Sequence, residues 1–191
     1  TADRFFAAVL WDFDGTLVDT ESRWVEAELA VLASHGVVWE PERANEFIGG
    51  PLTDVCEAMV ADLGESVTVD DVRRELITMV SQFNRERDVP WRPGVLDLLI
   101  EIRDAGIPTA IVTGSAHAVV EPVLAAMAER IGNPFETVVT FDDVTPETAK
   151  PAPDPYLLAA ERLGVSITDC LAIEDSPKGA TSATSAGAAV L

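Results

Sequence analysis

The sequence predicts an α/β fold in which a doubly wound parallel sheet forms a core and a block of helices is inserted into it. Short apolar segments alternate with helical segments through most of the chain, the pattern of a parallel sheet with helical crossovers. Between residues 21 and 90 the alternation stops and only helical spacing is found. The 191 residues, 48% of them hydrophobic, suit a core with a small inserted domain.

The first predicted strand covers residues 5–11, which are apolar, too few for a helix and without clean alternation. Such a segment is typical of a strand buried on both faces. It ends at Asp12 and Asp14, which are followed by Gly15 and Thr16. Open α/β sheets bind ligands at this end of their strands. Two carboxylates placed so close repel each other, and they usually need a cation.

The segment after this strand is expected to be helical throughout. Its predicted helices cover 21–34, 42–48, about 53–63 and about 70–87, the last two starting at Thr53 or Asp54 and at Asp70 or Asp71. In the first helix Trp24 is expected in the core, whereas Arg23 is expected on the surface, as is Arg92 further along. The predicted boundaries are therefore 1–20 and 91–191 for the core and 21–90 for the helical insert.

The rest of the core resumes the alternation. Strands are predicted at 107–112, 137–141, 170–173 and 188–191, and helices at 95–105, 116–130, 155–163 and 177–186. The chain stops on the last of these strands, and we expect further structure to follow it in the complete protein.

Polar residues follow several of these strands. Thr113, Gly114 and Ser115 come after the second strand, Lys150 stands in the loop after the third, and Glu174 and Asp175 follow the fourth. Singly, these segments are typical of a strand-to-helix turn, a solvated lysine and a helix N-terminus. A doubly wound sheet brings them to one edge. Acids that hold Mg²⁺, with a hydroxyl and an ammonium for phosphate oxygens, suit phosphoryl transfer.

The charge balance and the cysteines limit the partners. With 33 acidic and 13 basic residues the net charge is −20, which disfavours nucleic acid and anionic membranes and requires local positive charge at any phosphate site. The apolar runs are too interrupted to span a membrane. Cys56 and Cys170 lie far apart without metal-ligand spacing, as in a reducing compartment. We expect a cytoplasmic monomer that acts on a small molecule.

In their order along the chain, these segments resemble the four motifs of the haloacid dehalogenase-like (HAD) phosphohydrolase superfamily. The first motif is Asp12-Phe13-Asp14-Gly15-Thr16, with the tail Asp19-Thr20-Glu21. The tail, the helical insert and the run Lys150-Pro151-Ala152-Pro153-Asp154 resemble the subgroup of β-phosphoglucomutase and of phosphoglycolate and sugar-phosphate phosphatases. In that subgroup the insert is a cap that selects the substrate. The glycine-containing loop 47–52 would be the specificity loop of this cap or, alternatively, a simple turn between two helices.

The resemblance implies a role for each matching residue. Asp12 would attack phosphorus and form an aspartyl phosphate, and Asp14 would be the general acid and base. Phosphate would be bound by Gly15, Thr113, Gly114, Ser115 and Lys150. Mg²⁺ would be held by Asp12, Asp14 through its main-chain carbonyl, Asp175 and, directly or in the outer shell, Glu174.

The implied function is a Mg²⁺-dependent phosphatase for a small phosphorylated metabolite, such as a sugar phosphate or a phosphoglycolate-like ester. Asp14 favours phosphate esters over haloacids, since only an alkoxide leaving group needs an acid. A phosphosugar mutase is a first alternative, but Trp24 and His117 stand where mutases of the β-phosphoglucomutase type have His and Lys. A non-enzymatic phospho-acceptor module is a second, although receiver domains lack the insert and the second aspartate.

Overall fold

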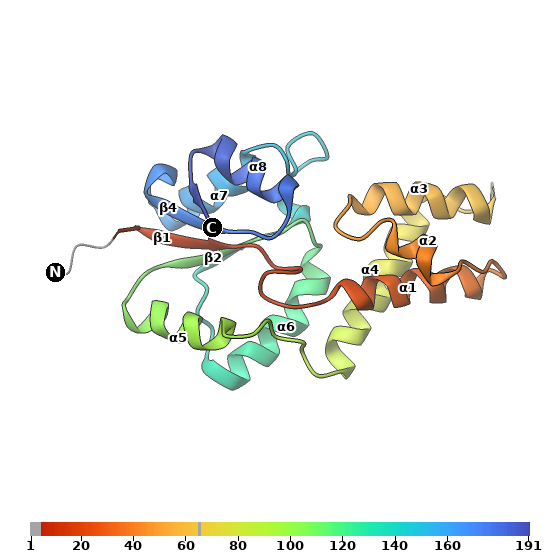
Figure 1. Ribbon diagram of the computed structural model, residues 1–191, viewed down its shortest axis with the longest axis horizontal. Helices are drawn as coiled ribbons and strands as arrows, with labels where there is room; N and C mark the ends of the chain where they lie inside the picture. Colours follow the sequence, from red (N-terminus) through yellow and green to blue (C-terminus); the bar gives the residue numbers. More distant parts are fainter. Residues whose placement is uncertain (1–4, 65) are drawn as a thin grey trace. The chain divides into compact units, whose positions relative to one another are not determined.

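The computed structural model describes residues 5–64 and 66–191, so residues 1–4 of the predicted core lie outside the described part. The chain forms two compact units, one made of the chain up to Asp19 together with Val89–Leu191, the other of Thr20–Asp88 (Figure 1). Among the described residues, none of the helices combines the length and apolar character needed to cross a membrane.

The first unit is built on a parallel sheet of five strands in the order β3-β2-β1-β4-β5, which confirms the predicted fold class. The strands are β1 (Ala8–Trp11), β2 (Thr109–Val112), β3 (Thr137–Val139), β4 (Cys170–Ile173) and β5 (Ala189–Val190). From β1 the chain winds outward to β2 and β3, then returns to place β4 on the other side of β1. The switch point between β1 and β4 is where such sheets bind ligands.

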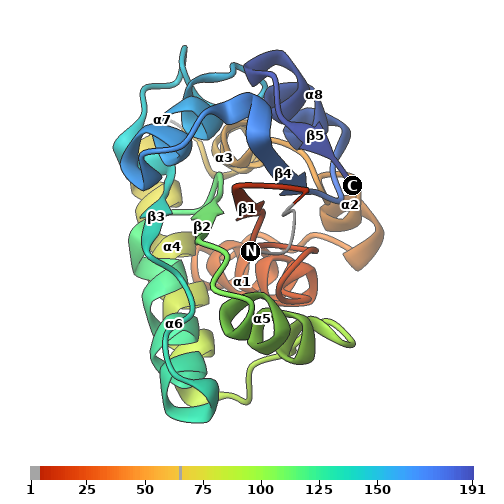
Figure 2. The same cartoon turned by 90° about the vertical axis from the view of Figure 1, so that its left-hand side faces the viewer.

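Helices cover both faces of this sheet. Figures 1 and 2 show α5 (Val95–Asp104) and α6 (His117–Ile131) on one face, and α7 (Asp154–Leu163) and α8 (Pro177–Ala186) on the other. Short 3₁₀ turns η1 (Phe141–Asp143) and η2 (Ile167–Asp169) precede α7 and β4. All four residues of β1 are buried, which explains the continuous apolar run in its sequence.

The strand β1 begins later than the sequence predicts. Phe5 is 96% exposed, and parallel pairing with β4 starts at Ala8. The main-chain N–H of Ala7 still donates to Asp169, at 2.7 Å, but no partner strand extends further back within the described residues. Hydrophobicity alone therefore predicts too long a strand, because the length of a strand also depends on how far the neighbouring strands extend.

The second unit contains α1 (Glu21–Ser34), α2 (Pro41–Asn45), α3 (Leu52–Leu63) and α4 (Val69–Glu86). Three of these helices, α2, α3 and α4, start before the predicted positions. Pro51 directly precedes α3, and the Thr68 side chain caps α4 in a reciprocal capping box with Asp71. A threonine hydroxyl at the N-cap and an acid three residues later satisfy the first free N–H groups.

The buried face of α1 carries a charge where the sequence predicted only apolar residues. Arg23, expected on the surface, is buried and donates to Asn84 Oδ1 at 2.6 Å and to the carbonyl of Asp88. Trp24, expected in the core, is only half-buried, while Arg92 is exposed as predicted. The arginine is tolerated because its partners on and after α4 satisfy its N–H groups.

Glu28, also on the buried face of α1, gives a prediction for stability. It is 5% exposed, its Oε2 has no hydrogen-bond partner in the described part of the chain, and burial raises its pKa from 4.5 to about 7. The folded state therefore holds this proton more tightly than the unfolded state. The contribution of Glu28 to the free energy of unfolding should fall as pH rises from 4.5 to 7, by about 2–3 kcal/mol.

Replacing Glu28 by Gln should remove this contribution. The free energy of unfolding of the variant should therefore increase relative to that of the wild type as pH rises. Urea unfolding in EDTA across that pH range measures the difference. Glu21→Gln removes the same charge from an exposed position of α1 and serves as the control. Parallel pH curves for wild type and Glu28→Gln would contradict the prediction.

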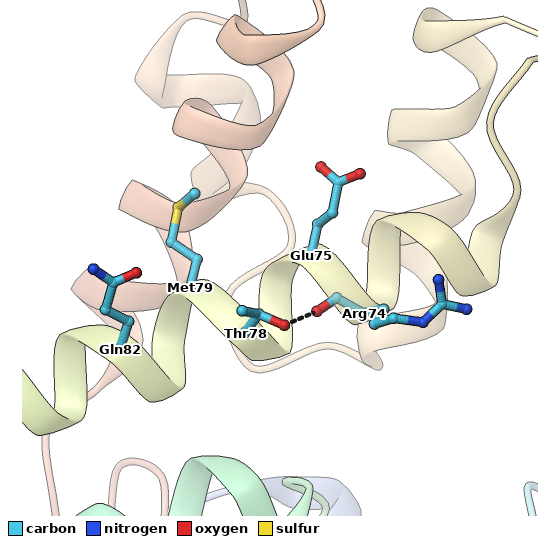
Figure 3. Close-up of a pocket in the computed structure, with 5 residues that line it drawn as sticks. All are labelled: Arg74, Glu75, Thr78, Met79 and Gln82. Carbon is cyan, nitrogen blue, oxygen red and sulfur yellow. Dashed lines mark hydrogen bonds between the residues drawn. The ribbon is translucent and has the colours of Figure 1, made fainter.

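A shallow hollow of about 290 Å³ lies along α4 (Figure 3), lined by Arg74, Glu75, Thr78, Met79 and Gln82. Its polar groups are already engaged: the Thr78 hydroxyl donates to the carbonyl of Arg74 at 2.7 Å, and Glu75 pairs with His35 at 3.2 Å. All its lining residues belong to one helix, and it offers no convergent set of catalytic groups.

Candidate active site

The candidate active site lies at the switch point of the sheet. Asp12 and Asp14 follow β1, Thr113 follows β2, Glu174 and Asp175 follow β4, and Lys150 stands in the loop before α7. In this topology the carboxyl ends of β1, β2 and β4 are neighbours. The sheet thus brings to one edge side chains that are up to 163 positions apart in the sequence.

Lys150 is the centre of the site. Its Nζ donates to Asp12 Oδ1 at 2.7 Å, to the Val112 carbonyl at 2.8 Å and to Glu174 Oε1. Burial acts to lower the pKa of Lys150, but the Asp12 and Glu174 carboxylates outweigh it and the pKa is raised. The lysine is therefore a buried ammonium, not the solvated residue that its sequence context alone suggests.

Asp12 is buried and crowded by negative charge. Burial raises its pKa, and the charges of Glu174 and Asp14 act in the same direction against the opposing Lys150. One ammonium therefore does not fully compensate the acids gathered here. The site favours a further cation or a proton on the carboxylates.

The carboxylates fit a divalent metal ion. Asp12, Glu174 and Asp175 each offer one oxygen, and these oxygens all lie within 4.8 Å of one another. Carboxylate oxygens are the ligands that Mg²⁺ prefers. Asp14 is predicted to bind the metal through its main-chain carbonyl, and its carboxylate is not part of this group.

Glu174 is held by more groups than the sequence suggested. The Tyr156 hydroxyl donates to its Oε1 at 2.6 Å, and the Ser176 hydroxyl donates to its Oε2 at 3.2 Å. Burial and the Glu174 carboxylate raise the pKa of Tyr156, so the hydroxyl keeps its proton. Sequence reasoning missed Tyr156; the available signal was the chain's only tyrosine on the apolar face of the helix that follows Lys150.

Thr113, Gly114 and Ser115 form the loop after β2, as predicted, but Ser115 faces a different partner. Its hydroxyl donates to Asp14 Oδ2 at 2.5 Å, and its N–H donates to Thr113 Oγ1 at 3.0 Å. Ser115 thus orients the predicted acid and base. Gly114 is exposed between two buried neighbours.

Gly15 contributes space to the site. It has a φ of +86°, and a Cβ there would lie 2.1 Å from Asp175 Oδ2. Its N–H, predicted to bind phosphate, instead donates to the Val18 carbonyl at 2.7 Å, because the chain turns tightly at this point. The next residue, Thr16, donates to Asp175 Oδ1 at 3.1 Å.

Comparison with known proteins identifies the family of the chain. A sequence profile of the haloacid dehalogenase-like hydrolases matches residues 6–187, nearly the whole chain. The chain belongs to this family. The predicted resemblance is confirmed, and the protein is a HAD-like hydrolase.

Individual relatives cover most of the chain. Protein CbbY of Cupriavidus necator is 34% identical over 195 residues, 94% of this chain and 75% of the relative. Hexitol phosphatase A of Escherichia coli is 33% identical over 185 residues, 95% of this chain and 80% of the relative.

Among solved structures, CbbY from Rhodobacter sphaeroides in complex with xylulose-1,5-bisphosphate superposes with a TM-score of 0.82 and 28% identity. The match covers 97% of this HAD-like hydrolase and 84% of that chain. Relatives named as phosphatases support the predicted class of phosphoric monoester hydrolase.

Gly179, which lies next to Glu174, gives a prediction for the stability of this HAD-like hydrolase. A Cβ at this position of α8 would lie 1.9 Å from Glu174 Oε1. Gly179→Ala should therefore push Glu174 away from Lys150 and Tyr156 and lower the free energy of unfolding by about 1–3 kcal/mol. Urea unfolding measures it, with Gly114→Ala, where a Cβ meets nothing within 4 Å, as the control. Equal stability of the two variants would contradict the prediction.

Proposed function

We propose that this HAD-like hydrolase is a Mg²⁺-dependent phosphatase for a small phosphorylated metabolite, a sugar phosphate or a phosphoglycolate-like ester. The observation that carries the proposal is the buried Lys150 ammonium between Asp12 and Glu174, with Asp14 two residues beyond Asp12. Relatives support the substrate class, since one is a hexitol phosphatase and another was crystallised with xylulose-1,5-bisphosphate.

In the first step a carboxylate oxygen of Asp12 attacks phosphorus, and the bond from phosphorus to the ester oxygen breaks. Asp14 gives its proton to the departing alkoxide, which leaves as an alcohol. Lys150 holds Asp12 Oδ1 at 2.7 Å and reduces the repulsion between the anionic nucleophile and the anionic ester.

In the second step water attacks the phosphorus of the aspartyl phosphate. Asp14, now a carboxylate, takes a proton from that water, and the bond between phosphorus and the Asp12 oxygen breaks. Inorganic phosphate leaves and Asp12 is regenerated. Ser115, which donates to Asp14 Oδ2 at 2.5 Å, orients Asp14 for both proton transfers.

Mg²⁺ would be held by Asp12, Asp175 and the main-chain carbonyl of Asp14, with Glu174 as a further or outer-shell ligand. When bound, it supplies positive charge that offsets the charges of nucleophile and phosphate. Thr113, Gly114 and Lys150 are the groups we assign to the phosphate oxygens, the first through its hydroxyl and the second through its N–H. The helical unit is assigned the role of a cap that selects the substrate.

Phosphate release from a panel of esters, with Mg²⁺ and with EDTA, tests the proposal. We expect inorganic phosphate from a sugar phosphate, hexitol phosphate, pentulose bisphosphate or phosphoglycolate, and loss of turnover in EDTA that added Mg²⁺ restores. Turnover in EDTA would refute the metal assignment. An isomeric sugar phosphate in place of inorganic phosphate would indicate the mutase, and stable phosphorylation without turnover would indicate the phospho-acceptor module.

A further inference from the structure

Tyr156 is a buried residue beside the candidate active site that the proposed mechanism does not use. It stands in the first turn of α7 and is fully buried. Its hydroxyl donates to Glu174 Oε1 at 2.6 Å, and its ring centroid lies 5.1 Å from Nζ of Lys150. One side chain thus contacts both members of the Lys150–Glu174 ion pair.

The hydroxyl of Tyr156 is an exception in its surroundings, which are apolar. The core between the sheet and helices α7 and α8 is otherwise made of small or aliphatic residues and one cysteine, namely Ala8, Leu10, Ala110, Val112, Val139, Ala159, Ala160, Cys170, Ala172, Ala183 and Ala186. Phenylalanine would fill the same space without a polar atom to satisfy. A hydroxyl in such a core is costly unless it is paired, and here its partner is Glu174.

The hydroxyl of Tyr156 donates a hydrogen bond to Glu174, and the orientation of this carboxylate decides whether its oxygens face Asp12 and Asp175. Lys150 and Tyr156 donate to Oε1 of Glu174, and Ser176 donates to Oε2. A lysine has a long flexible chain and can follow a carboxylate that rotates. The tyrosine ring is fixed by the packed core of α7, so its hydroxyl stays in one place. Outer-shell donors of this kind orient metal ligands.

We propose that Tyr156 is a positioning residue that holds the Glu174 carboxylate beside Asp12 and Asp175 and thereby sets the affinity of the site for its divalent cation. The proposal rests on the Mg²⁺ site of the proposed function. Tyr156 touches neither the nucleophile nor the phosphate in this scheme, so its effect passes through Glu174.

Isothermal titration of the full chain with MgCl₂, without substrate, tests the proposal. Tyr156→Phe should raise the Kd for Mg²⁺ by about 10-fold and move the urea midpoint in EDTA only slightly. Ala160→Gly, in the same helix and the same core, is the matched control: it softens α7 but should leave the Kd unchanged. Saturating Mg²⁺ should return kcat of Tyr156→Phe to within about 3-fold of wild type, because its defect lies in metal affinity.

Glu174→Gln sets the upper limit of the effect. Because Tyr156 acts through this carboxylate, the Gln variant should raise the Kd at least as much as Tyr156→Phe does. An unchanged Kd in Tyr156→Phe, an equal rise in Ala160→Gly, or a smaller rise in Glu174→Gln would each overturn the positioning role. A wild type that binds no Mg²⁺ in the titration would instead refute the metal of the proposed function, and the positioning role with it.

Discussion

Replacing Asp12 by Asn is expected to lower kcat for phosphate release by about 10⁴-fold or more, because an amide is a poor nucleophile toward phosphorus. The fold should survive the change. Asp12 is buried beside Glu174 and Asp14, and burial raises its pKa, so a neutral side chain of the same shape removes a cost. Lys150 keeps its contacts with Glu174 and the Val112 carbonyl.

Two measurements on Asp12→Asn separate catalysis from folding. Single-turnover phosphate release should be lost, while the Tm in EDTA should equal or exceed that of the wild type, and Mg²⁺ should raise it less. Asp97→Asn, at an exposed position of α5, controls for the loss of one negative charge. Full hydrolysis by Asp12→Asn would place the nucleophile elsewhere, and a collapse of Tm would mean that this carboxylate is needed for folding.

The fold could be predicted because local pattern and global structure agree in the core. The strands β1 to β4 are short apolar runs that are each followed by a polar residue, as β4 (Cys170–Ile173) is by Glu174, and each crossover carries a helix. Right-handed crossovers then leave few ways to order the strands. The carboxyl edge follows from that topology, which is why Asp12, Lys150 and Glu174 could be grouped before any geometry was known.

The sequence-based predictions fail at residues whose environment is set by partners far away in the sequence. Helical periodicity assigns Arg23 to solvent because it is charged, but its acceptors stand at Asn84 and Asp88. The pairing of Tyr156 with Glu174 is likewise a contact between segments that periodicity treats separately. Gly15 was expected to offer an N–H, whereas its contribution is room for Asp175, 160 positions away.

Replacing Lys150 by Met is expected to be the most damaging change to stability. It leaves the buried carboxylates of Asp12 and Glu174 without their shared cation, and removing one partner of a buried ion pair costs about 3–5 kcal/mol. The Tyr156 and Ser176 hydroxyls remain on Glu174, but hydroxyl groups cannot neutralise the charge. Urea unfolding in EDTA measures the loss, with Arg74→Met, whose side chain is 73% exposed, as a control for the charge removed.

Added Mg²⁺ separates the two contributions of Lys150. A divalent cation among Asp12, Glu174 and Asp175 compensates the carboxylates, so Mg²⁺ should stabilise Lys150→Met more than it stabilises the wild type. Activity should remain about 10²–10³-fold low, because no group replaces the ammonium that contacts Asp12 and that we assign to the phosphate. Wild-type stability of Lys150→Met in EDTA would show that Asp12 and Glu174 do not need this lysine to compensate their charge. Recovery of kcat with Mg²⁺ would show that the ammonium serves folding alone, since the cation would then supply all the charge that the reaction needs.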